Sequence, residues 1–235
     1  MIGRRRFLKR FLILASFIAA SISAFITLPS MLRRSERTIE EKIIALPKPP
    51  PISMSVEDAI QKRRSIREYK HPIDLIRLSQ LLLNSFKKVG EGYGLLTAAL
   101  NEVDVYLSVG EEKVVGVPAG VYLYLRDEHA LKVHREGNYL KELSSAALNQ
   151  PWVEEACFNI VLFANLREDS RLREGVVELS HICAGVLGEK VYLAAVGLGL
   201  ACVVIGAFYE DRVKAIFEVD SAKTPLYIIS VGDLV

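Results

Sequence analysis

The sequence contains little cysteine and none of the spacings that cysteine-based sites require. Its three cysteines, Cys157, Cys183 and Cys202, lie far apart in apolar surroundings and form no C-x-x-C pair. Zinc sites and thioredoxin-like redox motifs need closely spaced ligands, so we predict no metal site. Buried free thiols are favoured over a nucleophile or a disulfide, because unpaired cysteine behaves as a small hydrophobic residue. Outside the cell one pairing would still leave one cysteine over.

The sequence also lacks a phosphate-binding loop, internal repeats and low-complexity tracts. The glycine-rich stretch 90–94 (GEGYG) has neither the G-K-[ST] of a P-loop nor the strand-to-helix setting of a dinucleotide-binding turn. We interpret it as a flexible loop, which could also close over a substrate. Glu178 and His181 form one E-x-x-H pair, whereas di-iron bundles need two such pairs and further carboxylates. A hydrogen-bonded pair on one helix face is the favoured interpretation.

Excess positive charge is missing from most of the chain. The whole chain has 30 Lys and Arg and 28 Asp and Glu, but residues 1–37 hold eight of the basic residues and only one acidic residue. The remainder is therefore acidic on balance. We predict no nucleic-acid partner, because nucleic acid is bound by basic surfaces.

The basic residues of the N-terminus precede a long apolar run. Residues 4–9 (RRRFLK) are followed by uncharged residues 11–28. This pattern favours a twin-arginine-like export signal over residues 1–28, with an ordinary membrane anchor as the alternative. The run has about the minimum length for spanning a bilayer. We favour a retained anchor with the domain outside the cytoplasm, followed by a charged and then proline-rich linker over residues 29–54.

Residues 55–235 have the length and apolar content of one substantial domain. Ser55 and Asp58 form a helix-capping pattern, and a second helix with Leu78 and Phe86 on one face follows Pro72. A largely apolar helix over 175–196 must be buried in the core or between subunits, which favours a homodimer. Strands are predicted over 103–109, 121–125, 159–166, 201–205 and 225–231. The order predicts an α+β fold: a mixed or antiparallel sheet packed by helices, preceded by an apolar leader helix.

Three guanidinium groups and a hydroxyl cluster at the start of this domain. Arg63, Arg64, Ser65 and Arg67 follow a short predicted helix. Guanidinium groups bind phosphate through paired, charge-assisted hydrogen bonds, so the cluster is a candidate anion clamp. The alternative from these residues alone is a solvated basic helix end.

Residues 63–69 (RRSIREY) resemble the opening signature of the nitroreductase family of flavin mononucleotide (FMN) enzymes, and the surrounding sequence resembles its SagB-type dehydrogenase branch. Further stretches resemble blocks of that branch in the same order along the chain. They are 46–51 (LPKPPP), 103–109 (VDVYLSV), 120–131 (GVYLYLRDEHAL), 150–156 (QPWVEEA), 192–200 (YLAAVGLGL) and 226–232 (LYIISVG).

The resemblance implies a cofactor site but no catalytic side chain. Arg63, Arg64, Ser65 and Arg67 fall on the family positions that contact the FMN phosphate, ribityl chain and ring edge. Ile205 and Gly206 fall near the segment whose backbone lies along the flavin ring. Glycine allows such close approach because it has no side chain. The flavin itself performs the redox chemistry in this family, so we name no catalytic residue.

The sequence departs at three places from the nitroreductase and SagB-type patterns that it resembles. Residues 96–100 (LTAAL) replace a P-S-A-G-A-like loop that contacts the flavin, which puts the contact at Thr97, Ala98 and Ala99 in question. Glu189 and Lys190 replace a common Gln-Asn pair. The last five residues, 231–235 (VGDLV), contain none of the basic residues that close the phosphate site in many nitroreductases.

One tryptophan and three histidines are predicted to have structural or surface positions. Trp152, beside Pro151, is predicted to pack in the core, with a place beside the flavin or a partner subunit as the alternative. His71, His129 and His134 occupy turns or polar contexts and are predicted to be ordinary surface residues.

The resemblance implies an FMN-dependent oxidoreductase that transfers hydride or electrons between a reduced donor and a small organic or modified-peptide substrate. NAD(P)H is a candidate donor, although an exported enzyme would need a membrane quinone or another external electron partner. A homodimer tethered to the membrane is expected. The alternative is a membrane-anchored flavin-binding protein without turnover.

Overall fold

The structure is a computed structural model that describes residues 42–88, 95–165 and 173–235. The predictions for the leader (1–28) and the glycine-rich stretch (90–94) concern residues outside these ranges. The described helices are α2 (Val56–Lys62), α3 (Leu75–Phe86), α4 (Leu95–Glu102), α5 (Leu140–Ala146), α6 (Pro151–Glu155), α7 (Arg173–Leu198) and α8 (Glu210–Phe217). The described strands are β1 (Ile43–Ala45), β2 (Asp104–Val109), β3 (Gly120–Leu125), β4 (Ala130–Glu136), β5 (Phe158–Asn165), β6 (Leu200–Ile205) and β7 (Lys223–Asp233).

Seven strands form one sheet in the order β1-β4-β3-β2-β5-β7-β6. Each neighbouring pair in this order is antiparallel. The predicted α+β fold with helices packed on a sheet is therefore confirmed, and the sheet is antiparallel. The five predicted strands and the long helix over 175–196 correspond to β2, β3, β5, β6, β7 and α7.

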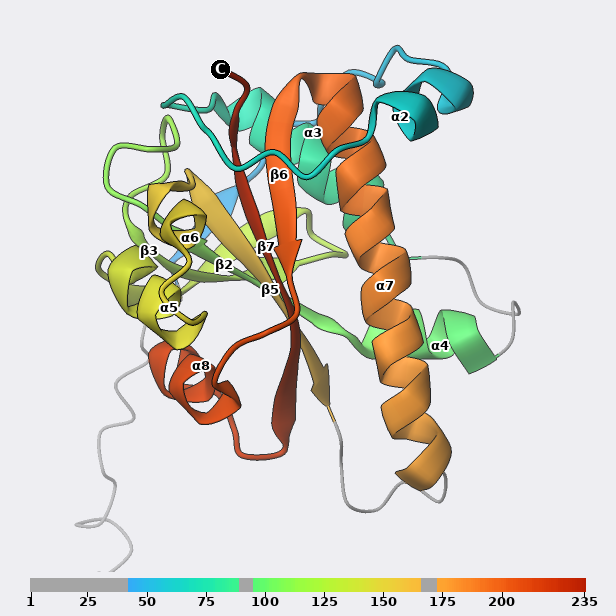
Figure 1. Ribbon diagram of the computed structural model, residues 1–235, viewed down its shortest axis with the longest axis vertical. Helices are drawn as coiled ribbons and strands as arrows, with labels where there is room; N and C mark the ends of the chain where they lie inside the picture. Colours follow the sequence, from blue (N-terminus) through green and yellow to red (C-terminus); the bar gives the residue numbers. More distant parts are fainter. Residues whose placement is uncertain (1–41, 89–94, 166–172) are drawn as a thin grey trace, which may run out of the picture. The chain divides into compact units, whose positions relative to one another are not determined.

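Helices cover the sheet on both faces. Figure 1 shows α3 and α7 on one side of it and α5, α6 and α8 on the other. The central strand β5 is consequently buried along almost its whole length, from Phe158 to Ala164. Strands covered on both faces have near-continuous apolar sequences, and β5 (FNIVLFAN) fits that expectation.

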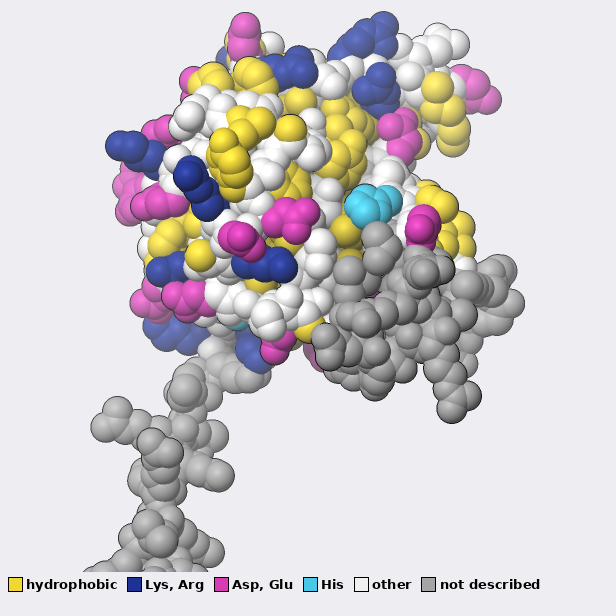
Figure 2. Space-filling view, turned by 60° about the horizontal axis from the view of Figure 1, so that its bottom comes forward, with side chains coloured by type: hydrophobic (Ala, Val, Ile, Leu, Met, Phe, Trp, Pro, Cys, Tyr) yellow, Lys and Arg dark blue, Asp and Glu magenta, His cyan; other side chains and the backbone are white. Residues whose placement is uncertain are grey.

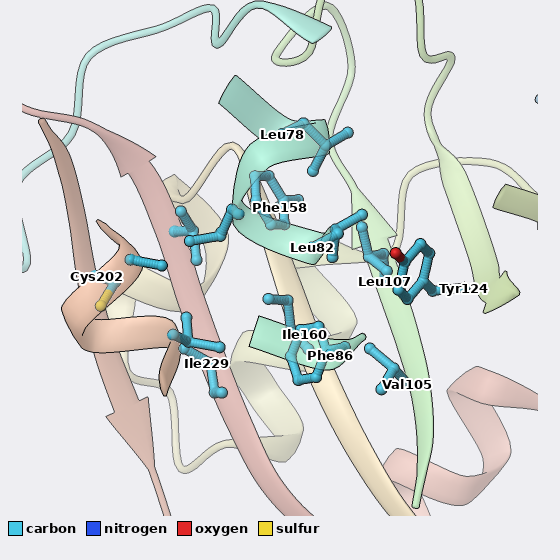
Figure 3. Close-up of a cluster of buried hydrophobic side chains, with 14 of the residues drawn as sticks. Leu78, Leu82, Phe86, Val105, Leu107, Tyr124, Phe158, Ile160, Cys202 and Ile229 are labelled. Carbon is cyan, nitrogen blue, oxygen red and sulfur yellow. The ribbon is translucent and has the colours of Figure 1, made fainter. Parts of the chain in front are cut away.

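The larger hydrophobic core lies between α3, α7 and the sheet. Figure 3 shows Leu78, Leu82 and Phe86 of α3 packed on side chains from β2, β3, β5, β6 and β7. A smaller cluster on the opposite face joins β6 and β7 to α8 through Ile205, Ile228 and Phe217. Asp74 precedes the first residue of α3, and its carboxylate accepts a hydrogen bond of 2.9 Å from the Arg77 backbone N–H. This is a standard N-cap, and it sets where the helix starts.

Helix α7 carries apolar side chains on its exposed face as well as its buried face. Cys183, Leu187 and Val191 are buried, whereas Ile182 is 55% exposed and Val186 is 37% exposed. The stretch Glu178–Leu198 is also long and apolar enough to cross a bilayer. Its packing against α3 and β6 accounts for the buried half of that composition.

Strand β1 corrects the predicted linker boundary. Residues 43–45 fall within the range 29–54 that the sequence predicts as linker, but they pair with 130–132 of β4 at the edge of the sheet. The segment that follows is also anchored: Ser79 Oγ donates to the Pro47 carbonyl, and Gln80 Nε2 donates to the Pro50 carbonyl at 2.9 Å. Three residues are too few to show the alternation typical of a strand. The linker prediction for this range therefore followed from its charged and proline-rich composition alone.

His129 is not the ordinary surface residue that its sequence context predicts. Its Nε2 lies 2.7 Å from Ser79 Oγ, and its Nδ1 lies 2.7 Å from the Tyr124 hydroxyl. Burial lowers the pKa of His129. His134 is exposed, as predicted. His71 also has an exposed surface, but its Nδ1 lies 3.2 Å from the Sγ of the buried Cys157, and partial burial lowers its pKa.

Charges of both signs alternate over the surface shown in Figure 2. Exposed ion pairs include Lys42 with Glu136 at 2.6 Å and Lys88 with Asp127 at 2.6 Å. Exposed pairs of this kind contribute little to stability, about 0–1 kcal/mol each.

Candidate functional site

Residues 63–70, here called the arginine segment, cross the end of the sheet beside β6 and β7 (Figure 1). Helix α2 starts at its N-cap Ser55, whose hydroxyl accepts from the Asp58 backbone N–H at 3.1 Å, and Arg63 is its C-cap. The extended chain then bonds to the sheet. Ile66 N–H donates to the Cys202 carbonyl at 2.9 Å, and Lys70 N–H donates to the Asp233 carbonyl at 2.9 Å. These bonds fix the segment along the edge of the fold.

The guanidinium groups of Arg63 and Arg67 rest on aromatic rings. The Arg63 guanidinium carbon lies 4.9 Å from the Tyr192 ring centroid, and that of Arg67 lies 5.1 Å from the Trp152 ring centroid. Stacking holds a guanidinium through its face and leaves its N–H edge available for an anion.

Neither stacked arginine is neutralised in the manner of Arg77. Arg77 donates two hydrogen bonds to Asp233, at 2.5 and 3.1 Å, and another to Asp74 at 2.6 Å. Among the described residues, the carboxylate nearest to Arg63 is that of Glu189 at 4.0 Å, and the Glu189 side chain is about half exposed. Such a contact is weak because water screens it. Arg63 and Arg67 therefore keep charge that an acidic ligand can use.

Arg64 lies differently from its neighbours. Its Nη1 donates to the carbonyls of Gln61 and Arg63, both at 2.8 Å. The side chain thus satisfies carbonyl groups at the C-terminal end of α2, where a cation is favourable. The structure gives Arg64 a helix-capping contact that the sequence pattern did not indicate.

Ser65 joins the arginine segment to α7 and β6. Its Oγ lies 2.7 Å from the Tyr192 hydroxyl, and the Tyr192 oxygen accepts from the Val204 backbone N–H at 3.2 Å. One phenol therefore connects a residue of the arginine segment to the strand that leads to Ile205 and Gly206.

Ile205 is the last residue of β6 and Gly206 follows it, and the two residues lie in different environments. The Ile205 side chain is buried in the cluster with Val213 and Phe217, so only its backbone is available to a ligand. Gly206 is exposed, and a Cβ placed there would lie 3.6 Å from the Tyr227 ring. The backbone at this strand end is therefore open to close approach.

Two buried polar atoms beside Arg67 have no hydrogen-bond partner among the described residues. They are the Tyr69 hydroxyl oxygen and Trp152 Nε1. Burial raises the pKa of Tyr69, and the nearby charge of Arg67 opposes that shift. Trp152 packs against the smaller core cluster, which confirms the packing prediction. Unpaired buried donors are unusual in folded proteins and suit a site that receives a polar ligand.

The departures at 96–100 and 189–190 have definite places in the fold. Residues 96–100, which stand where the family has the P-S-A-G-A-like loop, lie in helix α4, and Ala99 and Leu100 pack against the larger core. Glu189 is exposed beside Arg63, and Lys190 is half-buried, which lowers its pKa. The described residues contain no group of three side chains arranged to hold a metal ion, and Glu178 and His181 are exposed on α7.

Sequence reasoning missed Tyr192, because no local pattern connects it with the arginine segment. Tyr192 opens the stretch 192–200 (YLAAVGLGL) that resembles a family block, and it is a tyrosine within an otherwise aliphatic stretch, but neither feature gives it a role in the site.

Together the fold and the site define an α+β domain with a cationic, aromatic-lined edge at the end of its sheet. The model of the nitroreductase family matches residues 60–233, so the chain belongs to the nitroreductase family, a family of oxidoreductases. It is 31% identical over 182 residues to a Methanocaldococcus jannaschii protein whose name places it among the nitroreductases. That match covers 76% of this chain and 91% of the relative.

Solved structures agree on the fold. The structure of a protein described as a nitroreductase from Ralstonia eutropha JMP134 has a TM-score of 0.65 at 25% identity, covering 83% of this chain and 90% of that one. The structure of a protein from Anabaena variabilis with the same description has a TM-score of 0.72 at 24% identity, covering 83% of this chain but 42% of that one. The Escherichia coli microcin synthetase McbBCD complex with truncated pro-MccB17 bound has a TM-score of 0.60 at 18% identity, covering 87% of this chain and 82% of that one.

Proposed function

We propose that this protein is an FMN-dependent oxidoreductase that transfers hydride or electrons between a reduced donor and a small organic or peptide-derived substrate. The observation that carries the proposal is the pair of aromatic-stacked guanidinium groups, Arg63 and Arg67, for which the described residues supply no carboxylate closer than the 4.0 Å contact of Glu189 with Arg63. Family membership supplies the redox chemistry, which FMN provides when bound.

The residues present fit a flavin phosphate ester. Arg63, Ser65 and Arg67 lie along one extended segment and offer only positive charge and hydroxyl groups to a ligand. The unpaired donors Tyr69 and Trp152 lie beside Arg67, where the polar edge of a flavin ring would satisfy them. Gly206 leaves room for the ring to approach the backbone. In this proposal Arg64 contributes general positive charge, since its Nη1 is bonded to backbone carbonyls.

We also propose a homodimer formed through α7. Ile182, Gly185 and Val186 lie on its exposed face, and a helix that is apolar on both faces needs a second partner. An obligate homodimer interface would bury on the order of 2,000 Å² or more.

The location proposal follows from the N-terminal sequence. Arg4 and Arg5 precede an apolar run, which suits twin-arginine export and retention at the membrane with the domain outside the cytoplasm. In that location a membrane quinone or another external partner, in place of NAD(P)H, would exchange electrons with the protein.

The proposed substrate class includes modified peptides because of the SagB-type resemblance. The fold similarity to the McbBCD complex with truncated pro-MccB17 bound is compatible with this part of the proposal. Small organic acceptors such as quinones and nitroaromatics are the other candidates.

The test begins with the full-length protein purified in detergent. Absorbance near the flavin bands, release of FMN on denaturation, and reduction followed by reoxidation with an added quinone are the expected results. Bound flavin that can be reduced but is reoxidised by no acceptor would support the alternative, a flavin-binding protein without turnover. Failure to bind FMN when the apoprotein is titrated would overturn the proposal.

A further inference from the structure

Tyr192 occupies an unusual position in the candidate site, because a single hydroxyl contacts two separate chain segments. It bonds to Ser65 in the arginine segment and to Val204 in β6, while its ring supports the Arg63 guanidinium. Tyr192 is buried, with 5% of its surface exposed, whereas Ser65 is exposed.

The direction of the Ser65–Tyr192 hydrogen bond follows from the Val204 contact. Val204 N–H can only donate, so the Tyr192 oxygen accepts from it. If Ser65 also donated to Tyr192, the buried phenol hydrogen would have no acceptor among the described residues. An unsatisfied buried donor is costly, whereas the exposed Ser65 hydroxyl can use water or a ligand. The phenol hydrogen therefore points to Ser65 Oγ.

A donor chain results, running from Val204 N–H to Tyr192 and from Tyr192 to Ser65. The Ser65 hydroxyl accepts from Tyr192, and its own hydrogen remains free toward the exposed side of the arginine segment. Hydrogen bonds in such a chain polarise one another, which makes the final hydroxyl a better donor.

We propose that Tyr192 is a positioning residue that presents the Ser65 hydroxyl as a hydrogen-bond donor to the phosphate group of the bound flavin. The inference rests on the proposed function, since it names the group that the site would hold. The flanking guanidinium groups of Arg63 and Arg67 agree with an anionic acceptor at this point. The Tyr192 ring also keeps the Arg63 guanidinium beside the same hydroxyl.

The test is a double-mutant cycle that uses FMN and riboflavin as probes on apoprotein. Ser65→Ala should weaken FMN binding about tenfold, and Tyr192→Phe, which keeps the ring beneath Arg63, about three- to tenfold. The double variant should bind FMN no more weakly than Ser65→Ala alone, because both changes remove one donor chain. Riboflavin, which has no phosphate, should bind all four proteins equally. The ³¹P resonance of bound FMN should shift in both single variants.

Tyr122→Phe is the matched control. Tyr122 is buried, and its hydroxyl donates to the Pro118 carbonyl at 2.7 Å, outside the site. It should leave the affinity for both flavins unchanged. Additive losses, equal losses for FMN and riboflavin, or unchanged FMN binding in Tyr192→Phe would overturn the inference alone. Wild-type protein that binds no FMN would overturn the proposed function and this inference together.

Discussion

The ring of Tyr69 lies directly on the backbone of Gly232. A Cβ built on Gly232 would be 2.5 Å from Cβ, Cγ and Cδ1 of Tyr69, closer than side-chain atoms can approach. The arginine segment thus reaches strand β7 because position 232 has no side chain. Lys70 and Asp233, the next residues on each side, then pair through backbone hydrogen bonds at 2.9 and 3.2 Å.

Gly232→Ala should therefore loosen the arginine segment. We expect a loss of about 1–3 kcal/mol in the free energy of unfolding, typical of overpacking, together with weaker FMN binding. Chemical denaturation and flavin titration would measure these effects. Tyr69→Gly removes the Cβ as well as the ring, so Gly232→Ala should cost less stability in the Tyr69→Gly background than in the wild type. Equal effects of Gly232→Ala with and without the Tyr69 side chain would contradict this contact as the cause.

Loss of either stacked guanidinium should weaken FMN binding more than riboflavin binding. A charge-assisted hydrogen bond contributes about 1.5–3 kcal/mol, so Arg63→Ala or Arg67→Ala should raise the Kd for FMN roughly ten- to a hundredfold. Arg64→Ala should weaken FMN binding less than either of these variants, because the Arg64 Nη1 already bonds to two backbone carbonyls. The assignment fails if FMN and riboflavin bind with equal affinity, or if neither variant loses affinity.

Ile182→Glu should separate the proposed dimer. A charge at the centre of the exposed apolar face of α7 would be buried without a partner in the interface. Sedimentation at micromolar concentration should show a dimer for the wild type and a monomer for the variant. Val115→Glu, at an equally exposed position (55% in both) between β2 and β3, should remain a dimer. A flavin-loaded wild-type monomer would refute the proposed dimer.

Stability should fall as the pH drops below about 6.5, the ordinary pKa of histidine. Burial lowers the pKa values of His129 and His71, so the unfolded chain binds protons more readily than the folded chain in this range. The free energy of unfolding should therefore be highest above that pH and decline as the pH falls toward the folded-state values.

His129→Asn should reduce that pH dependence, because asparagine tolerates the φ of 49° at this position but does not titrate. Urea denaturation of wild type and variant between pH 5 and 8 would measure the change. A slope unchanged by the substitution would exclude His129 as a source of the effect.

Replacing Arg4 and Arg5 by lysine should retain the protein in the cytoplasm. Export by the twin-arginine route depends on the arginine pair, whereas an ordinary anchor needs only positive charge. Cell fractionation would show which applies. Unchanged export would remove the twin-arginine proposal and leave an anchor in place.

The sequence by itself determined the elements whose pattern is strong over a short range. Strands β2, β5 and β7 and helix α7 follow from apolar runs with strand or helix periodicity, and the capping pattern at Ser55 is visible in four residues. The close spacing of the arginines in the arginine segment was also visible in the sequence. Short or polar elements were missed, among them β1, β4 and α8, because a few residues of mixed character carry little periodic signal.

Only the tertiary structure decided which residues meet at the site. Ser65 and Tyr192 are separated by 127 positions, and nothing local to either encodes their contact. The same holds for Tyr69 with Gly232 and for the bonds that hold His129. The order of strands in the sheet and the packing of α7 bring such pairs together. That arrangement depends on burial summed over the whole core, whereas local patterns specify only the individual helices and strands.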